Sequence, residues 1–259
     1  MVFTKEQITS VETILRDSIR KKLLRYKPET KNMPFHFRLL GRDRMALYSF
    51  IQSLNTTFGI SIFEPVAVAL AKKRYLIAQS QYIVGTDEAQ RTIQNIINDL
   101  SIGKDANKKH EIELIRKACQ IGKVNTLKPV KVDLFIQDEL GVIYLFDLKT
   151  VKPNISNFKD FKRTLLEWCA IIITKLPTAE VHSMIAIPYN PYEPEPYQRW
   201  TLKGMLDMQN EIKIAEEFWD FLAGEGAYLQ LLDCFERVGI ELRQEIDDYF
   251  MRFSIAIEN

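Results

Sequence analysis

The chain has 259 residues, a formal net charge of +1, 46% hydrophobic residues, 27% charged residues and three cysteines. This composition excludes a disordered chain, and the wide spacing of Cys119, Cys169 and Cys234 excludes a disulfide framework or a zinc cluster. No apolar h-region follows the first residue, and the longest apolar run is far shorter than a membrane span. We therefore expect a soluble protein of the reducing cytoplasm, without a membrane segment.

Charge is distributed unevenly along the chain. Residues 1–44 hold eleven Lys/Arg against five Asp/Glu, whereas residues 201–259 hold five against thirteen. A basic end and an acidic end indicate one side that faces a polyanion and another that faces solvent or a partner. Two amphipathic helical regions with different solvent faces would give the same pattern, so charge alone leaves both interpretations open.

The N-terminal half has helical periodicity. Five helices are expected there, over residues 4–26, 42–57, 61–79, 86–100 and 107–120. Pro28 and Pro34 place a basic loop between the first two of these helices. Ser61 would cap the third helix, and Glu64 three residues later would complete a capping box.

The pattern changes after residue 125. KPVKVDLFI and GVIYLFDLK have strand periodicity and are joined by QDELG, and a helix over 155–175 and the short strand EVHSMIAIP follow. Four prolines within PYNPYEPEPYQRW then exclude helix and central strand, and two or three helices finish the chain. We expect one α/β domain over 1–259 with a mixed sheet. Residues 1–125 would form a mainly helical segment and residues 126–190 a catalytic sheet–helix core. Residues 191–259 would form a loop and the C-terminal helices.

Three charged residues lie at one end of the predicted hairpin. Asp133 belongs to the odd-numbered face of the first strand, and Asp147 and Lys149 belong to the odd-numbered face of the second. The even-numbered face of the pair is wholly apolar, which suits packing against a helix. The two odd-numbered faces coincide only if the loop has an odd number of residues or Gly141 forms a bulge. In that register the three charged groups converge.

Two carboxylates beside a lysine suit hydrolysis at phosphorus. Mg²⁺ prefers one or two carboxylates, several waters and substrate phosphate oxygens over a cage made by protein alone. The lysine can position or deprotonate an attacking water, and the metal stabilises the charge that develops during an in-line displacement. The alternative is a cross-strand Asp–Lys ion pair on a solvated sheet edge, because Asp-x-Lys by itself is a very common pattern.

Asp133, thirteen intervening residues and then Asp147-x-Lys149 resemble the PD-(D/E)xK nuclease signature. Pro129 lies four positions before Asp133, so the literal proline–aspartate pair is absent. The resemblance implies that Asp133 and Asp147 bind Mg²⁺ and that Lys149, with the metal, activates water. Enzymes of this kind frequently add a glutamate from an upstream helix, and by resemblance Glu64 would hold metal-bound water or a second ion. Its place in a capping box is the alternative role.

Longer segments resemble the TdeIII-type family of type II restriction endonucleases. They are DLKTVKPNISNFKDFKRTLLEW, AIPYNPYEPEPYQRWT and EEFWDFLAGEGAYLQLLDCFERVGIELRQEIDDYF. The resemblance covers about residues 130–253 and the N-terminal half less distinctly. It implies a PD-(D/E)xK core and Mg²⁺-dependent cleavage of both DNA strands at a short palindrome of a GGNCC-like kind, leaving 5′-phosphate and 3′-hydroxyl ends. A palindromic target favours a homodimer, and the cognate DNA methyltransferase would be the genetic partner.

Several polar residues after the hairpin are candidates for DNA contact. They are Lys152, Asn154, Lys159, Lys162, Arg163, Tyr189, Asn190 and Arg199. The helix that carries Lys159 and Arg163 would follow the catalytic strand, so its basic face would meet phosphates or base edges near the cut. A solvated basic face and a packed surface loop are the alternatives. A structure-selective repair or recombination nuclease and a non-catalytic DNA-binding module are the competing functions.

Overall fold

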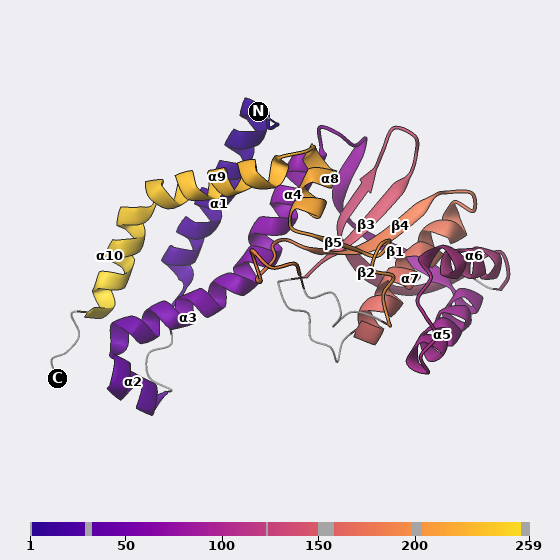
Figure 1. Cartoon of the computed structure of the whole chain (residues 1–259), viewed down its shortest axis with the longest axis horizontal. Coiled ribbons are helices and arrows are strands. Elements are labelled where there is room, and N and C mark those ends of the chain that lie inside the picture. The colour runs from indigo at the N-terminus through magenta and orange to yellow at the C-terminus, as the bar shows by residue number, and fades with distance from the viewer. Residues whose placement is uncertain (1, 29–32, 123, 150–157, 198–203, 255–259) are drawn as a thin grey trace. The chain divides into compact units, whose positions relative to one another are not determined.

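A computed structural model describes residues 2–28, 33–122, 124–149, 158–197 and 204–254. The chain divides into two compact units, which we treat separately (Figure 1): a helical unit, 1–66 with 226–259, and a sheet unit, 67–225. Neither junction falls at residue 125 or 190, where the sequence predicted changes of character. That residues 1–259 form a single domain stays a prediction.

The sheet unit is built on a five-stranded mixed sheet in the order β1-β2-β3-β4-β5. The strands are Ile77–Thr86, Val124–Gln137, Ile143–Leu148, Val181–Ile187 and Ile212–Ile214. β1, β2 and β3 are antiparallel neighbours, whereas β4 is parallel to β3 and β5 is parallel to β4. A parallel pair needs a crossover connection, and α7 (Phe158–Lys175) lies in the connection between β3 and β4. The predicted mixed α/β architecture is confirmed.

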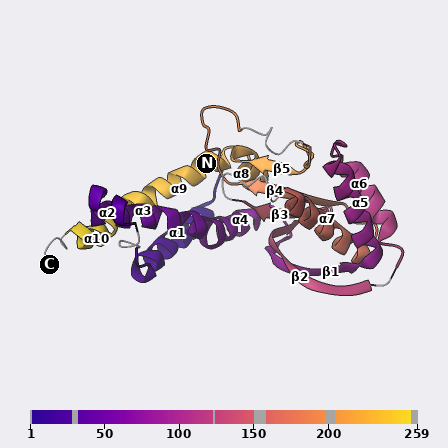
Figure 2. The same cartoon turned by 90° about the horizontal axis from the view of Figure 1, so that it is seen from below.

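Helices cover both faces of this sheet (Figures 1 and 2). α7 contacts β1, β3 and β4, and it packs in turn against α5 (Asp87–Ser101) and α6 (Lys108–Ala118). On the other face, Phe218 and Phe221 of α8 (Glu216–Ala223) pack edge-on against Phe146. The even-numbered face of β3 therefore packs on a helix as predicted. The odd-numbered face is also buried near the turn, because central strands of a mixed sheet are covered on both sides.

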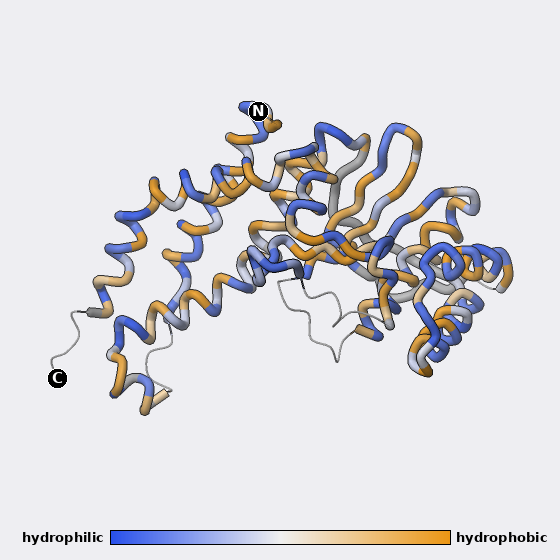
Figure 3. Tube along the Cα trace, viewed as in Figure 1, coloured by the Kyte–Doolittle hydropathy of each residue, from blue (hydrophilic) through white to orange (hydrophobic). Residues whose placement is uncertain are grey.

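The helical unit consists of helices from both ends of the chain. They are α1 (Lys5–Arg25), α2 (Pro34–Leu40), α3 (Arg42–Thr57), η1 (Phe58–Phe63), α9 (Ala227–Glu241) and α10 (Arg243–Ser254), and α4 (Glu64–Ala71) crosses the junction between the units. α1 packs against α9, and α3 packs against α10. Hydrophobic and hydrophilic residues alternate along α1 and α10, whereas the central strands of the sheet unit are mainly hydrophobic (Figure 3).

The third predicted helix differs most from the structure. The π-helical turn η1 carries α3 directly into α4, so no helix begins at Ser61 and the capping box with Glu64 is wrong. The helix ends at Ala71, and residues 77–79 already belong to β1. Pro34 begins the short helix α2 instead of lying in a loop, which suits a residue without an N–H. Within the described ranges no single helix is long and apolar enough to cross a membrane; residues 42–57 and 61–71, bent by 54°, satisfy that test only as a pair.

Candidate active site

The β2–β3 hairpin places Asp133 and Asp147 at the same end of one sheet face. The ladder pairs Leu134 with Phe146 and Gln137 with Ile143, which leaves an odd-numbered loop between the paired positions. The observed register is therefore the one on which the predicted convergence depends. Paired backbone stops at Leu134 and Phe146, and the next position of each strand carries an aspartate.

Beyond the last paired residues of the β2–β3 ladder, a hydrogen bond to the Asp133 carboxylate links the two strands. Its Oδ2 accepts a hydrogen bond of 2.9 Å from the backbone N–H of Leu148. On the other side of β3, the N–H of Lys149 donates to the carbonyl oxygen of Ala186 in β4, also at 2.9 Å. Neighbours on both sides therefore hold the backbone that presents Asp147 and Lys149.

Asp147 lies in an environment that opposes its charge. It is only 6% exposed. Its pKa is raised to about 6, mainly because of burial; Lys149 lowers the pKa and the adjacent Asp133 raises it. The Lys149 Nζ lies 2.7 Å from Asp147 Oδ1 and 4.7 Å from the centre of the Phe161 ring of α7. The positive charge of Lys149 therefore offsets only part of the rise in the pKa of Asp147 that burial and Asp133 cause.

Lys131 is a second lysine at this site that the sequence analysis did not single out. Its Nζ lies 3.6 Å from Asp133 Oδ1, and its side chain is 39% exposed. The sequence does place Lys131 beside Asp133, because the two residues are two positions apart and share one face of β2. The two carboxylates are therefore flanked by Lys131 on one strand and Lys149 on the next.

The donor set fits a hard divalent cation. Asp133 and Asp147 supply carboxylate oxygens from adjacent strands, and a cation beside them would favour the ionised form of Asp147, whose pKa is raised mainly by burial. Mg²⁺ characteristically takes one or two carboxylates and keeps waters or phosphate oxygens for its remaining positions. Among the described residues there is no group of three or more His, Cys, Asp or Glu side chains that could hold a metal ion. The two aspartates therefore suit an ion that shares its coordination with substrate and water.

Lys162 is not on the solvent-facing basic surface predicted for α7. It is 0% exposed, and its Nζ contacts the carboxylates of Glu111 and Glu211, at 2.6 Å for Glu211. Glu211 also pairs with the buried Lys108 at 2.8 Å. A lysine with two buried carboxylate partners is unavailable to a phosphate, so the DNA contact predicted for Lys162 is wrong. We call Lys108, Glu111, Lys162 and Glu211 the buried ion cluster.

The remaining residues of α7 that were predicted to contact DNA differ in their surroundings. Lys159 is exposed. Arg163 donates a hydrogen bond to the side chain of Gln94 in α5, so part of its guanidinium is already engaged. Lys152 and Asn154 lie outside the described residues.

The proline–tyrosine loop is organised by its own hydrogen bonds. The Asn190 side chain donates to the carbonyl oxygen of Glu195 at 2.7 Å and accepts from the N–H of Tyr192 at 3.0 Å. Tyr189 is half-buried, and burial raises its pKa. Arg199 lies outside the described residues. The loop is therefore self-supporting near Asn190, and its contact with DNA stays a prediction.

Glu64 belongs to the helical unit, at the start of α4. It is half-buried and has an interaction partner, so its side chain is not free. Its proposed role as a metal ligand stays a prediction.

Known proteins with similar sequences are restriction enzymes. The family model described as "Type II restriction endonuclease, HinfI" matches residues 3–239. The chain is 29% identical over 222 residues to the type II restriction enzyme HgiCII of Herpetosiphon aurantiacus, which covers 82% of this chain and 80% of that protein. It is 27% identical over 220 residues to HgiEI of the same organism, with 82% and 79% covered. It is 28% identical over 228 residues to MjaII of Methanocaldococcus jannaschii, with 75% and 59% covered.

These similarities confirm the expected relationship to type II restriction endonucleases. The family whose model matches is HinfI, and a closer relationship to TdeIII-type enzymes stays a prediction.

Proposed function

Because the chain belongs to the HinfI family of type II restriction endonucleases, we propose that Asp133, Asp147 and Lys149 form its phosphodiester-cleaving site. The observation that supports this assignment is the convergence of two carboxylates and a lysine at the end of the β2–β3 hairpin, with the pKa of Asp147 raised to about 6. Perturbed titration at a cluster of charged groups is typical of catalytic sites. A structural ion pair alone would not need a second carboxylate beside the buried one.

The residues of this site would have two tasks, metal binding and proton transfer. Asp133 and Asp147 would hold Mg²⁺, which when bound supplies stabilisation of the charge that develops on the phosphate. Lys149 would position the attacking water and, in its neutral amine form, would accept the proton of that water. The backbone of β3, held by Asp133 on one side and by Ala186 on the other, fixes the orientation of Asp147 and Lys149. Glu64 would support metal-bound water.

The target would be a short palindrome of the GGNCC kind, cut in both strands to leave 5′-phosphate and 3′-hydroxyl ends. A palindrome presents the same site on both strands, so a two-fold symmetric homodimer would place one catalytic site at each cut. Lys159, Arg163, Tyr189 and Asn190 are the described candidates for DNA contact. We place the enzyme in the cytoplasm beside a cognate DNA methyltransferase, which would protect the host sequence.

The test is cleavage of unmodified plasmid by the purified full chain in Mg²⁺ and in EDTA. Discrete fragments whose ends map to one palindromic sequence, formed only with the metal, would support the proposal. Lys149→Ala and Asp147→Ala should both remove the fragments while the proteins remain folded by circular dichroism. Cutting confined to branched or nicked substrates would instead indicate a structure-selective nuclease. Metal-independent DNA binding without cutting would leave a non-catalytic module.

A further inference from the structure

α1 carries two groups of basic residues in different surroundings. Arg16 is paired with Glu241 of α9 at 2.7 Å, and Arg20 is paired with Glu245 of α10 at the same distance. The acidic C-terminal helices therefore neutralise part of the basic N-terminal segment. These arginines are held by carboxylates within the helical unit and are not available to an external anion.

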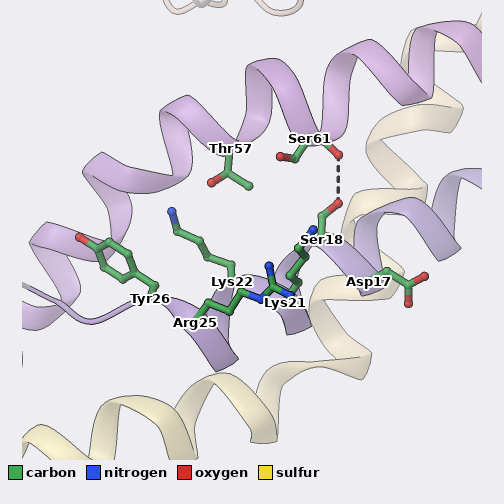
Figure 4. A pocket seen from close by; sticks show the side chains of 8 residues that line it. All are labelled: Asp17, Ser18, Lys21, Lys22, Arg25, Tyr26, Thr57 and Ser61. Atoms are coloured by element: carbon green, nitrogen blue, oxygen red, sulfur yellow. Dashed lines mark hydrogen bonds between the residues drawn. The ribbon is translucent and has the colours of Figure 1, made fainter.

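The second basic group lines a hollow within the helical unit (Figure 4). Lys21, Lys22 and Arg25 of α1 face the α3–η1 segment across a cavity of about 580 Å³. In the described chain none of these three side chains forms an ion pair, and Lys21 and Arg25 also make no hydrogen bond through their side chains. Asp17 is the one carboxylate at the rim, and Figure 4 shows it directed away from the other lining side chains. The hollow therefore holds an excess of positive charge.

Three of the four hydroxyl groups that line this cavity, those of Ser18, Tyr26 and Thr57, already donate to backbone carbonyl oxygens. Ser18 donates to the carbonyl oxygen of Ser61 at 3.0 Å, drawn as a dashed line in Figure 4. Thr57 donates to Ser53 and Tyr26 donates to Ser49, again to backbone carbonyl oxygens. The donors that remain for a ligand are therefore the Ser61 hydroxyl and three cationic side chains, which favours an anion that accepts hydrogen bonds.

The surroundings of Lys22 also favour an anion in the cavity. Its Nζ donates to the Ser53 carbonyl oxygen at 3.2 Å and lies 4.5 Å from the centre of the Tyr26 ring. Neither contact brings a countercharge, and burial lowers the pKa of Lys22. An anion in the cavity would favour the charged form of this lysine.

We propose that the cavity between α1 and the α3–η1 segment binds a phosphate group of the DNA backbone. This inference rests on the proposed function, which makes DNA the substrate, and adds a contact outside the hydrolytic site. Phosphate oxygens accept hydrogen bonds from ammonium and guanidinium groups without reading base identity, so the contact would be independent of sequence. A free phosphate anion has the same chemistry and is the other possible source of the ligand.

The experiment compares two double variants of the full chain that remove equal charge from one helix. Lys21→Gln with Arg25→Gln changes the cavity, and Arg16→Gln with Arg20→Gln is the matched control outside it. Duplex binding is measured by fluorescence anisotropy in EDTA over a range of salt concentrations, so that cleavage does not interfere. Each lost phosphate contact lowers the slope of log K against log salt by about 0.9, so the cavity variant, which loses one phosphate contact, should lose about 0.9 units of slope. The control should keep the wild-type slope.

A second measurement identifies the source of the phosphate. Calorimetric titration with sodium pyrophosphate tests a free anion directly, and circular dichroism confirms that both variants are folded. An equal loss of slope in both variants would overturn the proposal, because general charge would then explain the effect. Unchanged DNA binding with loss of pyrophosphate binding would assign the cavity to a free anion and overturn the DNA source. If wild-type cleavage is normal and the cavity variant keeps its salt slope, this inference fails and the proposed nuclease function stands.

Discussion

The sheet unit contains two clusters made from the same residue types, lysine and carboxylate, with opposite electrostatic character. In the buried ion cluster, Lys108 and Lys162 balance Glu111 and Glu211. Although burial acts in the other direction, the two lysines hold the pKa of Glu211 below its ordinary value. At the hairpin end, burial and Asp133 outweigh Lys149, so the pKa of Asp147 is raised.

The difference shows how burial and pairing together determine the pKa of a carboxylate in each cluster. Each carboxylate of the buried ion cluster has a lysine partner within hydrogen-bonding distance, so its charge is stable in the folded protein. At the hairpin end, by contrast, Asp147 is buried while Lys131 and Lys149 are partly exposed, with side-chain exposures of 39% and 30%, so the lysines offset the burial of Asp147 less completely. Such a site gains from a cation, whereas the buried cluster has no need of one.

The largest expected effect is the loss of cleavage on removal of Lys149. A proton-transfer residue typically contributes about 10²- to 10⁴-fold to the rate, so Lys149→Ala should lower single-turnover cleavage by about a thousandfold. Lys109→Ala removes an exposed lysine of α6 and serves as the control, with cleavage close to wild type. If Lys149→Ala cleaves at a rate within tenfold of wild type, Lys149 is not a catalytic residue, and the cluster at the hairpin end is then structural like the buried ion cluster.

Removal of Glu211 should affect stability instead. Glu211→Ala leaves Lys108 and Lys162 buried with one carboxylate between them, which costs about 3–5 kcal/mol of unfolding free energy. Urea denaturation measures the change, and Glu113→Ala on the exposed side of α6 is the control. A loss below 1 kcal/mol would mean that the buried ion cluster is not held together by its charges.

The raised pKa of Asp147 predicts a stability that depends on pH. The folded-state pKa of about 6 exceeds the ordinary value of 3.8, so the protonated form is favoured by folding. This contribution is fully present below pH 3.8 and is lost as pH rises through 6. In metal-free buffer, wild type should therefore lose up to about 3 kcal/mol relative to Asp147→Asn between pH 4 and pH 7. Parallel stability curves from urea denaturation would show that Asp147 titrates normally.

Lys131 should give the smallest effect. It lies 3.6 Å from Asp133 and is 39% exposed, so solvent screens its charge. We expect Lys131→Ala to lower the cleavage rate by about tenfold, equivalent to about 1.4 kcal/mol, and Lys131→Arg to restore most of it. If Arg fails to restore the rate lost in Ala, charge is not the property that matters at this position.

The geometry of the β2–β3 hairpin could be predicted from the sequence because its information is local. Alternating apolar residues define both strands, and the spacing from Asp133 to Asp147 determines which side chains share a face. The neighbouring Lys131 was overlooked although the same alternation places it beside Asp133. The helices α1, α5, α6 and α7 were predicted for a similar reason, since each has its own periodicity of apolar residues.

The burial of Lys162 could not be predicted in this way. Its partners Glu111 and Glu211 are 51 and 49 residues away in the chain, so no local pattern distinguishes it from the exposed Lys159. β1 was not predicted, and its first three residues fell within an expected helix, because its pairing partner β2 begins far along the chain, at Val124. β5, with three residues, is too short to show an alternation.

The two hydrogen bonds at the end of β3 have a consequence for isotope exchange. The amide proton of Leu148 is held by a side chain from β2, and that of Lys149 is held by a carbonyl oxygen from β4. Protons held in this way exchange with deuterium only when the structure around them opens. Removal of the Asp133 carboxylate would release the first amide and leave the second protected. Deuterium uptake at these adjacent residues therefore reports separately on how each neighbouring strand supports the segment that carries Asp147 and Lys149.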